Sequence, residues 1–210
     1  MLEILTGAGL ATASGLNAFI PLLAVGLLAR FTDLVTLPGG WAWLENPWVL
    51  GILAVLLVLD LVADKIPAVD HVNDWVQTFV RPTAGGIVFG AGSASQTAAV
   101  QDPAAFFSSN AWGPIATGIA LALVTHLAKA ATRATANAVT GGVAAPVLSI
   151  GEDAMSIGLV FSALIVPVLV LLFLVFLALF GWWMYRSFRR VRDGRRRKCG
   201  DAAAVASRAL

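Results

Sequence analysis

Long runs of apolar residues are the feature that most constrains this chain. The clearest early run is Val49 to Ala63, VLGILAVLLVLDLVA, and a longer one extends from Met155 to Tyr185. A helix that crosses a bilayer core needs about 20 apolar residues. Only 12% of the 210 residues are charged, whereas a soluble domain carries about 25%. This is too little charge to cover a soluble surface, so we expect an integral membrane protein.

Six hydrophobic segments are predicted, and all of them are expected to be helical, which gives an all-α, polytopic fold. The fifth contains Gly141, Gly142 and Pro146, so it either crosses the membrane or re-enters from one side. Pro167 is expected to kink the sixth. Six crossings would divide into two halves of three, the second inverted relative to the first, as in many secondary transporters. The segments cover about residues 4–29, 49–63, 83–99, 112–128, 134–150 and 155–185.

Basic residues gather near the end of the sequence. Eight of the 14 Lys and Arg residues lie between Arg186 and Lys198. This run could bind nucleic acid or lipid headgroups, but we favour a topogenic signal that keeps it in the cytoplasm, with no nucleic acid as partner. The chain therefore divides into a helical transmembrane domain, residues 1–185, and a basic, disordered cytoplasmic tail, residues 186–210.

The chain between the second and third segments is amphipathic. Its apolar residues from Val69 to Phe79 form one helical stripe, with polar residues largely elsewhere. This pattern predicts a short interfacial helix, or a helical hairpin that dips into the protein. Asp70, His71 and Asp74 have ligand types that could hold a divalent ion, although the wet face of an interfacial helix is the favoured interpretation.

Two acidic residues stand inside or beside the second apolar run. Asp60 and Asp64 are four residues apart, so they share one face of a helix. Ionisable groups at membrane depth are expensive and by default mark function. The pair could carry a proton or bind a cation through oxygen ligands. Hydrogen bonding to a neighbouring helix is the alternative for Asp60, and Lys65 is expected to extend to the interface.

A second group of ionisable residues is basic. His126, Lys129 and Arg133 have spacings of three and four, which place them on one helix face. They are expected to contact an anionic substrate, to form a structural ion-pair network, or to serve as plain topogenic charge. Glu152 and Asp153 can be their partners only if residues 134–150 do not cross the membrane, because a full crossing would separate them.

Two segments combine polar residues with helix breakers. Asn17 precedes Pro21 in the first, and Asn137 precedes two glycines and a proline in the fifth. Such breaks free backbone groups that line the substrate path in transporters and channels. Close helix packing through small residues is the alternative.

Three stretches carry a family resemblance: SGLNAFIPLLAVGLLARF, DKIPAVDHVNDWVQTFVRPTAGG, and HLAKAATRATANAV followed by SIGED. They resemble the bacterial membrane proteins grouped as domain of unknown function 4126. The resemblance covers about residues 8–157, and DKIPAVD followed by RPTAGG is its most specific part. It implies a small multi-pass protein of the bacterial cytoplasmic (inner) membrane, and it implies no activity.

These patterns favour a small secondary transporter or ion-coupled permease. Its partners would be the lipid bilayer, a small ion or anionic solute, and a second copy of the chain. The alternative is a non-transporting scaffold or assembly factor whose charges are interhelical ion pairs. Nucleotide-binding, zinc and serine-hydrolase motifs do not occur in the sequence, so we expect neither an enzyme nor a cofactor.

Overall fold

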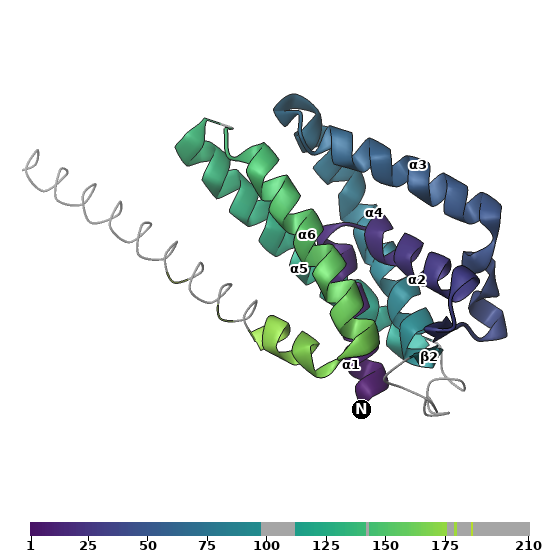
Figure 1. Ribbon diagram of the computed structural model, residues 1–210. Coiled ribbons are helices and arrows are strands. Elements are labelled where there is room, and N and C mark those ends of the chain that lie inside the picture. Colours follow the sequence, from purple (N-terminus) through teal and green to yellow (C-terminus); the bar gives the residue numbers. More distant parts are fainter. Residues whose placement is uncertain (98–111, 142, 176–178, 180–185, 187–210) are drawn as a thin grey trace, which may run out of the picture. The chain divides into compact units, whose positions relative to one another are not determined.

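The computed structural model describes residues 1–97, 112–141, 143–175, 179 and 186, without the side chains of residues 67–71, 138 and 139. Helices account for nearly all of the described residues, which confirms the all-α prediction. The named elements lie in the first of two compact units, Met1–Leu171, the second being Leu172–Leu210. In chain order they are α1 (Leu2–Leu16), α2 (Phe19–Phe31), β1 (Val35–Thr36), the 3-10 helix η1 (Gly39–Glu45), α3 (Pro47–Ala63), α4 (Pro67–Ala94), β2 (Gln96–Thr97), α5 (Trp112–Thr140) and α6 (Ala145–Ile165) (Figure 1).

The α1 helix is the centre of the first unit. It packs against α4, α5 and α6, whereas α3 packs mainly against α2 and η1 (Figure 1). The helices α4 and α5 approach each other closely at Gly85 and Gly118, where a Cβ on either glycine would collide with the backbone oxygen of the other. Only glycine lets the two backbones meet in this way, a device common where helices associate in membranes.

Asparagine, proline and glycine fix several helix boundaries. The Asn46 side chain accepts a hydrogen bond from the Trp48 N–H, and Pro47 between them is the first residue of α3. The helices α4 and α6 also carry a proline at their start, where the missing N–H costs no helical hydrogen bond. The helix α5 ends before Gly141, whose φ of +62° lies in the left-handed region that favours glycine.

The stretch from Pro67 to Ala94 is one continuous helix, which corrects two predictions. The sequence pattern indicated a short interfacial helix and a separate segment over residues 83–99. Instead α4 continues through Pro82, although this residue cannot donate a helical hydrogen bond. Packing against α1 and α5 holds the helix together. The predicted segment also ends early, because Gln96 and Thr97 form β2, which pairs antiparallel with β1.

Residues 134–150 do not form a segment of their own. Residues 134–140 complete α5, and α6 begins at Ala145 after a turn. The predicted fourth and fifth segments therefore merge in part, and the expected six crossings and inverted repeat are not confirmed. The last helix begins earlier than predicted, and its end at Ile165 confirms the break expected at Pro167. The first segment is also broken, between Leu16 and Phe19.

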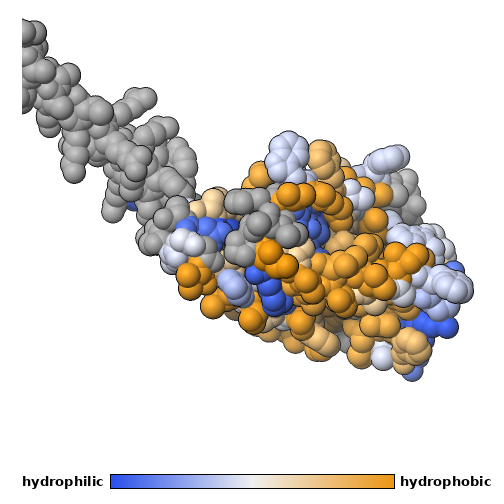
Figure 2. Space-filling model, turned by 90° about the horizontal axis from the view of Figure 1, so that it is seen from above, coloured by the Kyte–Doolittle hydropathy of each residue, from blue (hydrophilic) through white to orange (hydrophobic). Residues whose placement is uncertain are grey.

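The exterior of the first unit is apolar while charged side chains lie inside it. On α3, Trp48 and Ile52 are 82% and 60% exposed, whereas Asp60 is 3% exposed. Figure 2 shows hydrophobic residues over much of the face seen from above, with hydrophilic residues in smaller groups. A soluble protein has the opposite distribution, so this surface fits lipid.

Two of the described helices are long and apolar enough to cross a membrane, at Trp112–Asn137 and Ala145–Ile165. The helices η1 and α3 together would make a third span if the two are taken as one broken helix with a bend of 59°. The helices α1 and α2 are apolar but shorter. The predicted basic tail, residues 186–210, lies outside the described residues except for Arg186.

Candidate functional site

Six ionisable side chains meet inside the first unit. Two carboxylates come from the end of α3, one arginine from α4, two cations from α5 and one carboxylate from α6. None of the six side chains is more than 12% exposed. Three cations thus face three carboxylates away from water. We call this group the buried ion cluster, and its members are Asp60, Asp64, Arg81, Lys129, Arg133 and Glu152.

Asp64 forms ion pairs with all three cations of the cluster. Its Oδ2 lies 3.3 Å from Lys129 Nζ and 3.1 Å from Arg133 Nη2, and its Oδ1 accepts a hydrogen bond from Asn73 Nδ2 at 2.9 Å. Asp64 is therefore held by two cations and one amide at once.

Glu152 contributes to the cluster from α6. Arg133 donates to Glu152 Oε2 from Nε at 3.0 Å and from Nη2 at 2.6 Å. Lys129 Nζ lies 3.1 Å from the same oxygen. The sequence allowed this pairing only if residues 134–150 did not cross, and the turn after Thr140 provides that arrangement. Arg133 therefore joins the end of α3 to α6.

Asn17 occupies the break between α1 and α2. Its Oδ1 accepts hydrogen bonds from the N–H groups of Phe19 at 3.0 Å and Ile20 at 3.3 Å, which caps the start of α2. Its Nδ2 donates to Asp153 Oδ1 at 3.0 Å. The Asn17 side chain therefore both caps α2 and forms a hydrogen bond with α6.

The same break supplies backbone oxygens to the buried ion cluster. The last carbonyls of a helix have no partner within it, and α1 ends at Leu16. The Leu16 carbonyl accepts a hydrogen bond from Lys129 Nζ at 2.8 Å, and the Gly15 carbonyl accepts one from Arg81 Nη1 at 3.5 Å. The negative end of the α1 dipole thus faces two cations, which it stabilises.

Asp60 makes the loosest ionic contact in the cluster. Its Oδ1 accepts hydrogen bonds from Asn73 at 2.7 Å and from Gln77 at 2.6 Å. Its Oδ2 lies 4.0 Å from Arg81 Nη2. Within the described residues, neither of these two buried atoms has a hydrogen-bond partner. If the ion pairs of the cluster rearrange, separating Asp60 from Arg81 breaks the weakest of them.

His126 contacts the cluster as a neutral group. Its Nδ1 lies 3.4 Å from Arg81 Nη1, and its Nε2 lies 3.1 Å from Thr78 Oγ1. The Thr78 hydroxyl already donates to the Asp74 carbonyl at 2.8 Å, so it accepts from Nε2. Arginine has only donors, so Nδ1 is an acceptor. This pattern fits an imidazole with its single proton on Nε2.

The structure brings most of the predicted path and coupling residues together. These are Asn17, Asp60, Asp64, His126, Lys129, Arg133, Glu152 and Asp153.

The other predicted residues lie elsewhere. Pro21 is buried near the start of α2. Lys65 is exposed and donates to the Leu61 carbonyl at 2.9 Å. On α5, Asn137 Oδ1 is buried without a hydrogen-bond partner within the described residues.

The divalent-ion site remains a prediction, because the structure describes the side chain of only one of its three candidates. The side chains of Asp70 and His71 lie outside the described residues. Asp74 is described, and its Oδ1 is buried without a hydrogen-bond partner among the described atoms. In the part of the chain that the structure describes, no three His, Cys, Asp or Glu side chains are arranged to hold a metal.

Sequence reasoning missed three polar residues on α4. Asn73 and Gln77 hold the two acids of α3, and Arg81 is fully buried beside them. The sequence analysis did not name Arg81 as a candidate site residue. The available signal was spacing, because residues 73, 77 and 81 follow one another at intervals of four and so share one helix face.

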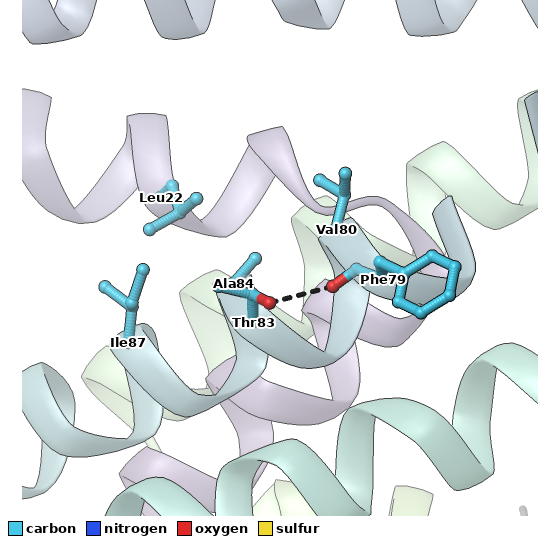
Figure 3. A pocket seen from close by; sticks show the side chains of 6 residues that line it. All are labelled: Leu22, Phe79, Val80, Thr83, Ala84 and Ile87. Carbon is cyan, nitrogen blue, oxygen red and sulfur yellow. Dashed lines mark hydrogen bonds between the residues drawn. The ribbon is translucent and has the colours of Figure 1, made fainter. Parts of the chain in front are cut away.

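An apolar pocket lies between α2 and α4. Val80, Ala84 and Ile87 point from α4 toward α2, which contributes Leu22 (Figure 3). The remaining lining residues are Phe79 and Thr83, and the Thr83 hydroxyl donates to the Phe79 carbonyl at 2.8 Å. No ionisable group lines this pocket, so it is not a site for charged ligands.

Comparison with known proteins identifies one relationship. A family model described as "Domain of unknown function (DUF4126)" matches residues 4–187, and the chain belongs to this family. No curated protein and no solved structure matches the chain.

Proposed function

We propose that this member of the DUF4126 family is a small multi-pass permease that couples the movement of an anionic solute to a proton. The observation that carries the proposal is the buried ion cluster beside the break between α1 and α2. Charged groups inside an apolar protein are expensive to keep, and in membrane proteins they mark ion and substrate pathways.

The broken helix supports a transport role. In many transporters, discontinuous helices present free backbone groups at the centre of the membrane, where they bind ions and substrates. Here the carbonyls of Gly15 and Leu16 face Arg81 and Lys129. The cluster thus combines backbone and side-chain groups in the way that such sites do.

The proposed coupling follows from competition for two cations. Asp64 and Glu152 both hold Lys129 and Arg133. When a proton neutralises Asp64, Glu152 is the one charged carboxylate that Lys129 and Arg133 still share. Their remaining positive charge can then bind an anionic solute. Proton and anion then move together, because each favours the binding of the other.

We extend the proposal to the membrane arrangement. The protein would lie in the bacterial inner membrane with its basic tail in the cytoplasm, in agreement with the positive-inside rule. The helices α3, α5 and α6 would be among those that cross the bilayer, and a second copy of the chain could complete the pathway. The mechanism requires no enzymatic step and no cofactor.

The test is charge movement on solid-supported membranes that carry the purified protein. Jumps of pH and of small organic anions should give a current in the wild type, and Asp64→Asn should abolish it while the protein stays folded. Asp33→Asn makes the same chemical change at an exposed residue and should keep the current. Equal currents in both variants would refute the coupling role of Asp64.

A scaffold remains the second candidate because the charges of the cluster balance one another. Such a network can be purely structural. In that case the basic tail would bind anionic lipid or a cytoplasmic protein. Deletion of residues 186–210 separates the two candidates: a scaffold should lose its partner, whereas a permease should keep its current.

A further inference from the structure

The Lys129 ammonium group is surrounded by oxygen atoms from three helical elements. It lies 2.8 Å from the Leu16 carbonyl oxygen, 3.3 Å from Asp64 Oδ2 and 3.1 Å from Glu152 Oε2. The residue is only 4% exposed. One backbone oxygen at the end of a helix and two carboxylates are ligands that also suit a metal cation without a hydration shell.

We propose that these three oxygens form a monovalent-cation site, which Lys129 fills with its own ammonium group and which a free K⁺ ion occupies when that group is removed. Ammonium and K⁺ are similar in size and charge, so the same oxygens can hold either. We call the three oxygens the cation cage. Their source is specific to this fold, since the Leu16 oxygen is available only because α1 ends there.

The charge of the cluster supports the proposal independently of the cage geometry. With Lys129 in place, three cations face three carboxylates. Removal of the ammonium leaves one net negative charge among buried groups. A buried unpaired charge is strongly unfavourable, and a free cation in the cage would cancel it.

The occupied cage also has a consequence for ion coupling, which rests on the proposed permease function: it determines which ion can drive transport. An ammonium group tethered in the site excludes K⁺ and Na⁺ from it. Transport by the wild type should therefore be unchanged when K⁺ or Na⁺ is replaced by choline. The coupling ion is then the proton, and Lys129 is the residue that determines this specificity.

The cage is tested by the effect of K⁺ on thermal unfolding of Lys129→Ala in detergent. KCl is compared with choline chloride at equal ionic strength. The unfolding midpoint of the variant should rise by about 5–10 °C when K⁺ is at 100 times its dissociation constant, and the wild type should show no such rise. Lys129→Met also removes the charge but fills the cage with an apolar chain, so it should not respond to K⁺.

The ligands are tested in the same background. Adding Glu152→Gln to Lys129→Ala removes one ligand charge and restores the charge balance, so the response to K⁺ should disappear. A K⁺ response that persists in this double variant would place the ion elsewhere and overturn the proposal. So would a Lys129→Ala protein that does not respond to K⁺, or that fails to fold even in KCl, since a free ion could not then replace the ammonium.

The outcomes also separate the cage from the proposed permease. A K⁺ response in Lys129→Ala together with no current in the wild type would support the cage and refute the permease. A proton-driven current in the wild type without any K⁺ response in the variant would do the reverse. A wild-type current that requires K⁺ or Na⁺ would contradict the exclusion of these ions by Lys129.

Discussion

Arg133 and Asp64 are 69 residues apart in the sequence, yet Arg133 Nη2 donates a hydrogen bond to Asp64 Oδ2 at 3.1 Å. The same guanidinium group binds Glu152. One side chain of α5 therefore holds the end of α3 and the start of α6. Its contacts lead to the first two predictions.

Arg133→Ala should destabilise the protein by about 3–5 kcal/mol, because two buried carboxylates lose one of the two cations that they share. Denaturant unfolding followed by circular dichroism would measure the loss. Arg30→Ala is the control: this exposed arginine donates to the Glu45 carbonyl, and its removal should cost less than about 1 kcal/mol. Equal losses for the two variants would show that the cluster adds little to stability.

Arg133 and Glu152 should also be energetically coupled. A double-mutant cycle with Arg133→Gln and Glu152→Gln should give an interaction free energy of about 0.5–3 kcal/mol, as expected for contacting residues in one network. Additive effects of the two changes would contradict the bidentate contact.

Asn17→Ala should destabilise the protein by about 1 kcal/mol through loss of the α2 cap. Asn17→Asp keeps the cap oxygen but brings a second carboxyl next to Asp153, so it should also destabilise. Combining it with Asp153→Asn exchanges donor and acceptor across the same contact and should restore stability. Failure of the exchanged pair to recover any stability would mean that the contact between α2 and α6 is not what Asn17 provides.

Gly85→Ala and Gly118→Ala should each destabilise the protein or prevent folding, because their methyl groups would collide with the opposing backbone. Gly158→Ala is the matched control, since nothing lies within 4 Å of a Cβ at that helical position. It should raise stability by about 0.5–1 kcal/mol, the helix propensity gained over glycine. Thermal unfolding of the three variants measures both directions, and a neutral Gly85→Ala would contradict the close approach of α4 and α5.

The turn after α3 and the turn after α5 should lie on the same side of the membrane. Figure 1 shows both at the same end of the first unit, with the start of η1 elsewhere. Single cysteines introduced by Lys65→Cys and Val143→Cys, with Cys199→Ser as background, should react with an impermeant maleimide from the cytoplasmic side. Gly40→Cys should react from the opposite side. Labelling of positions 65 and 143 from different sides would contradict the antiparallel α5–α6 arrangement.

Helix type and local spacing were predictable from the sequence. The interval of four between Asp60 and Asp64 predicted a shared face, and both acids indeed bind the same Asn73 amide. The Asn17 break was visible as a polar residue and a proline in a small-residue run. These features depend on neighbours within about one helix turn, so a single sequence contains them.

The segment boundaries and the partners of the charges were less predictable. Polar residues near Arg133 suggested the end of one span and the start of another, but they belong to a helix that continues to Thr140. Its cations are compensated by Asp64 and by the Leu16 carbonyl, 113 residues before Lys129. Hydropathy shows how much charge a segment has, and only tertiary structure shows what neutralises it.

The distribution of the cluster over four helices also constrains how the protein is made. A ribosome delivers the two acids of α3 first, one arginine with α4, then two cations with α5, and Glu152 only with α6. After α3, α4 and α5 in turn, the part of the cluster already made carries two negative charges, one negative charge and one positive charge. We therefore expect the early helices to remain with the insertion machinery, released into lipid only after α6 has been synthesised.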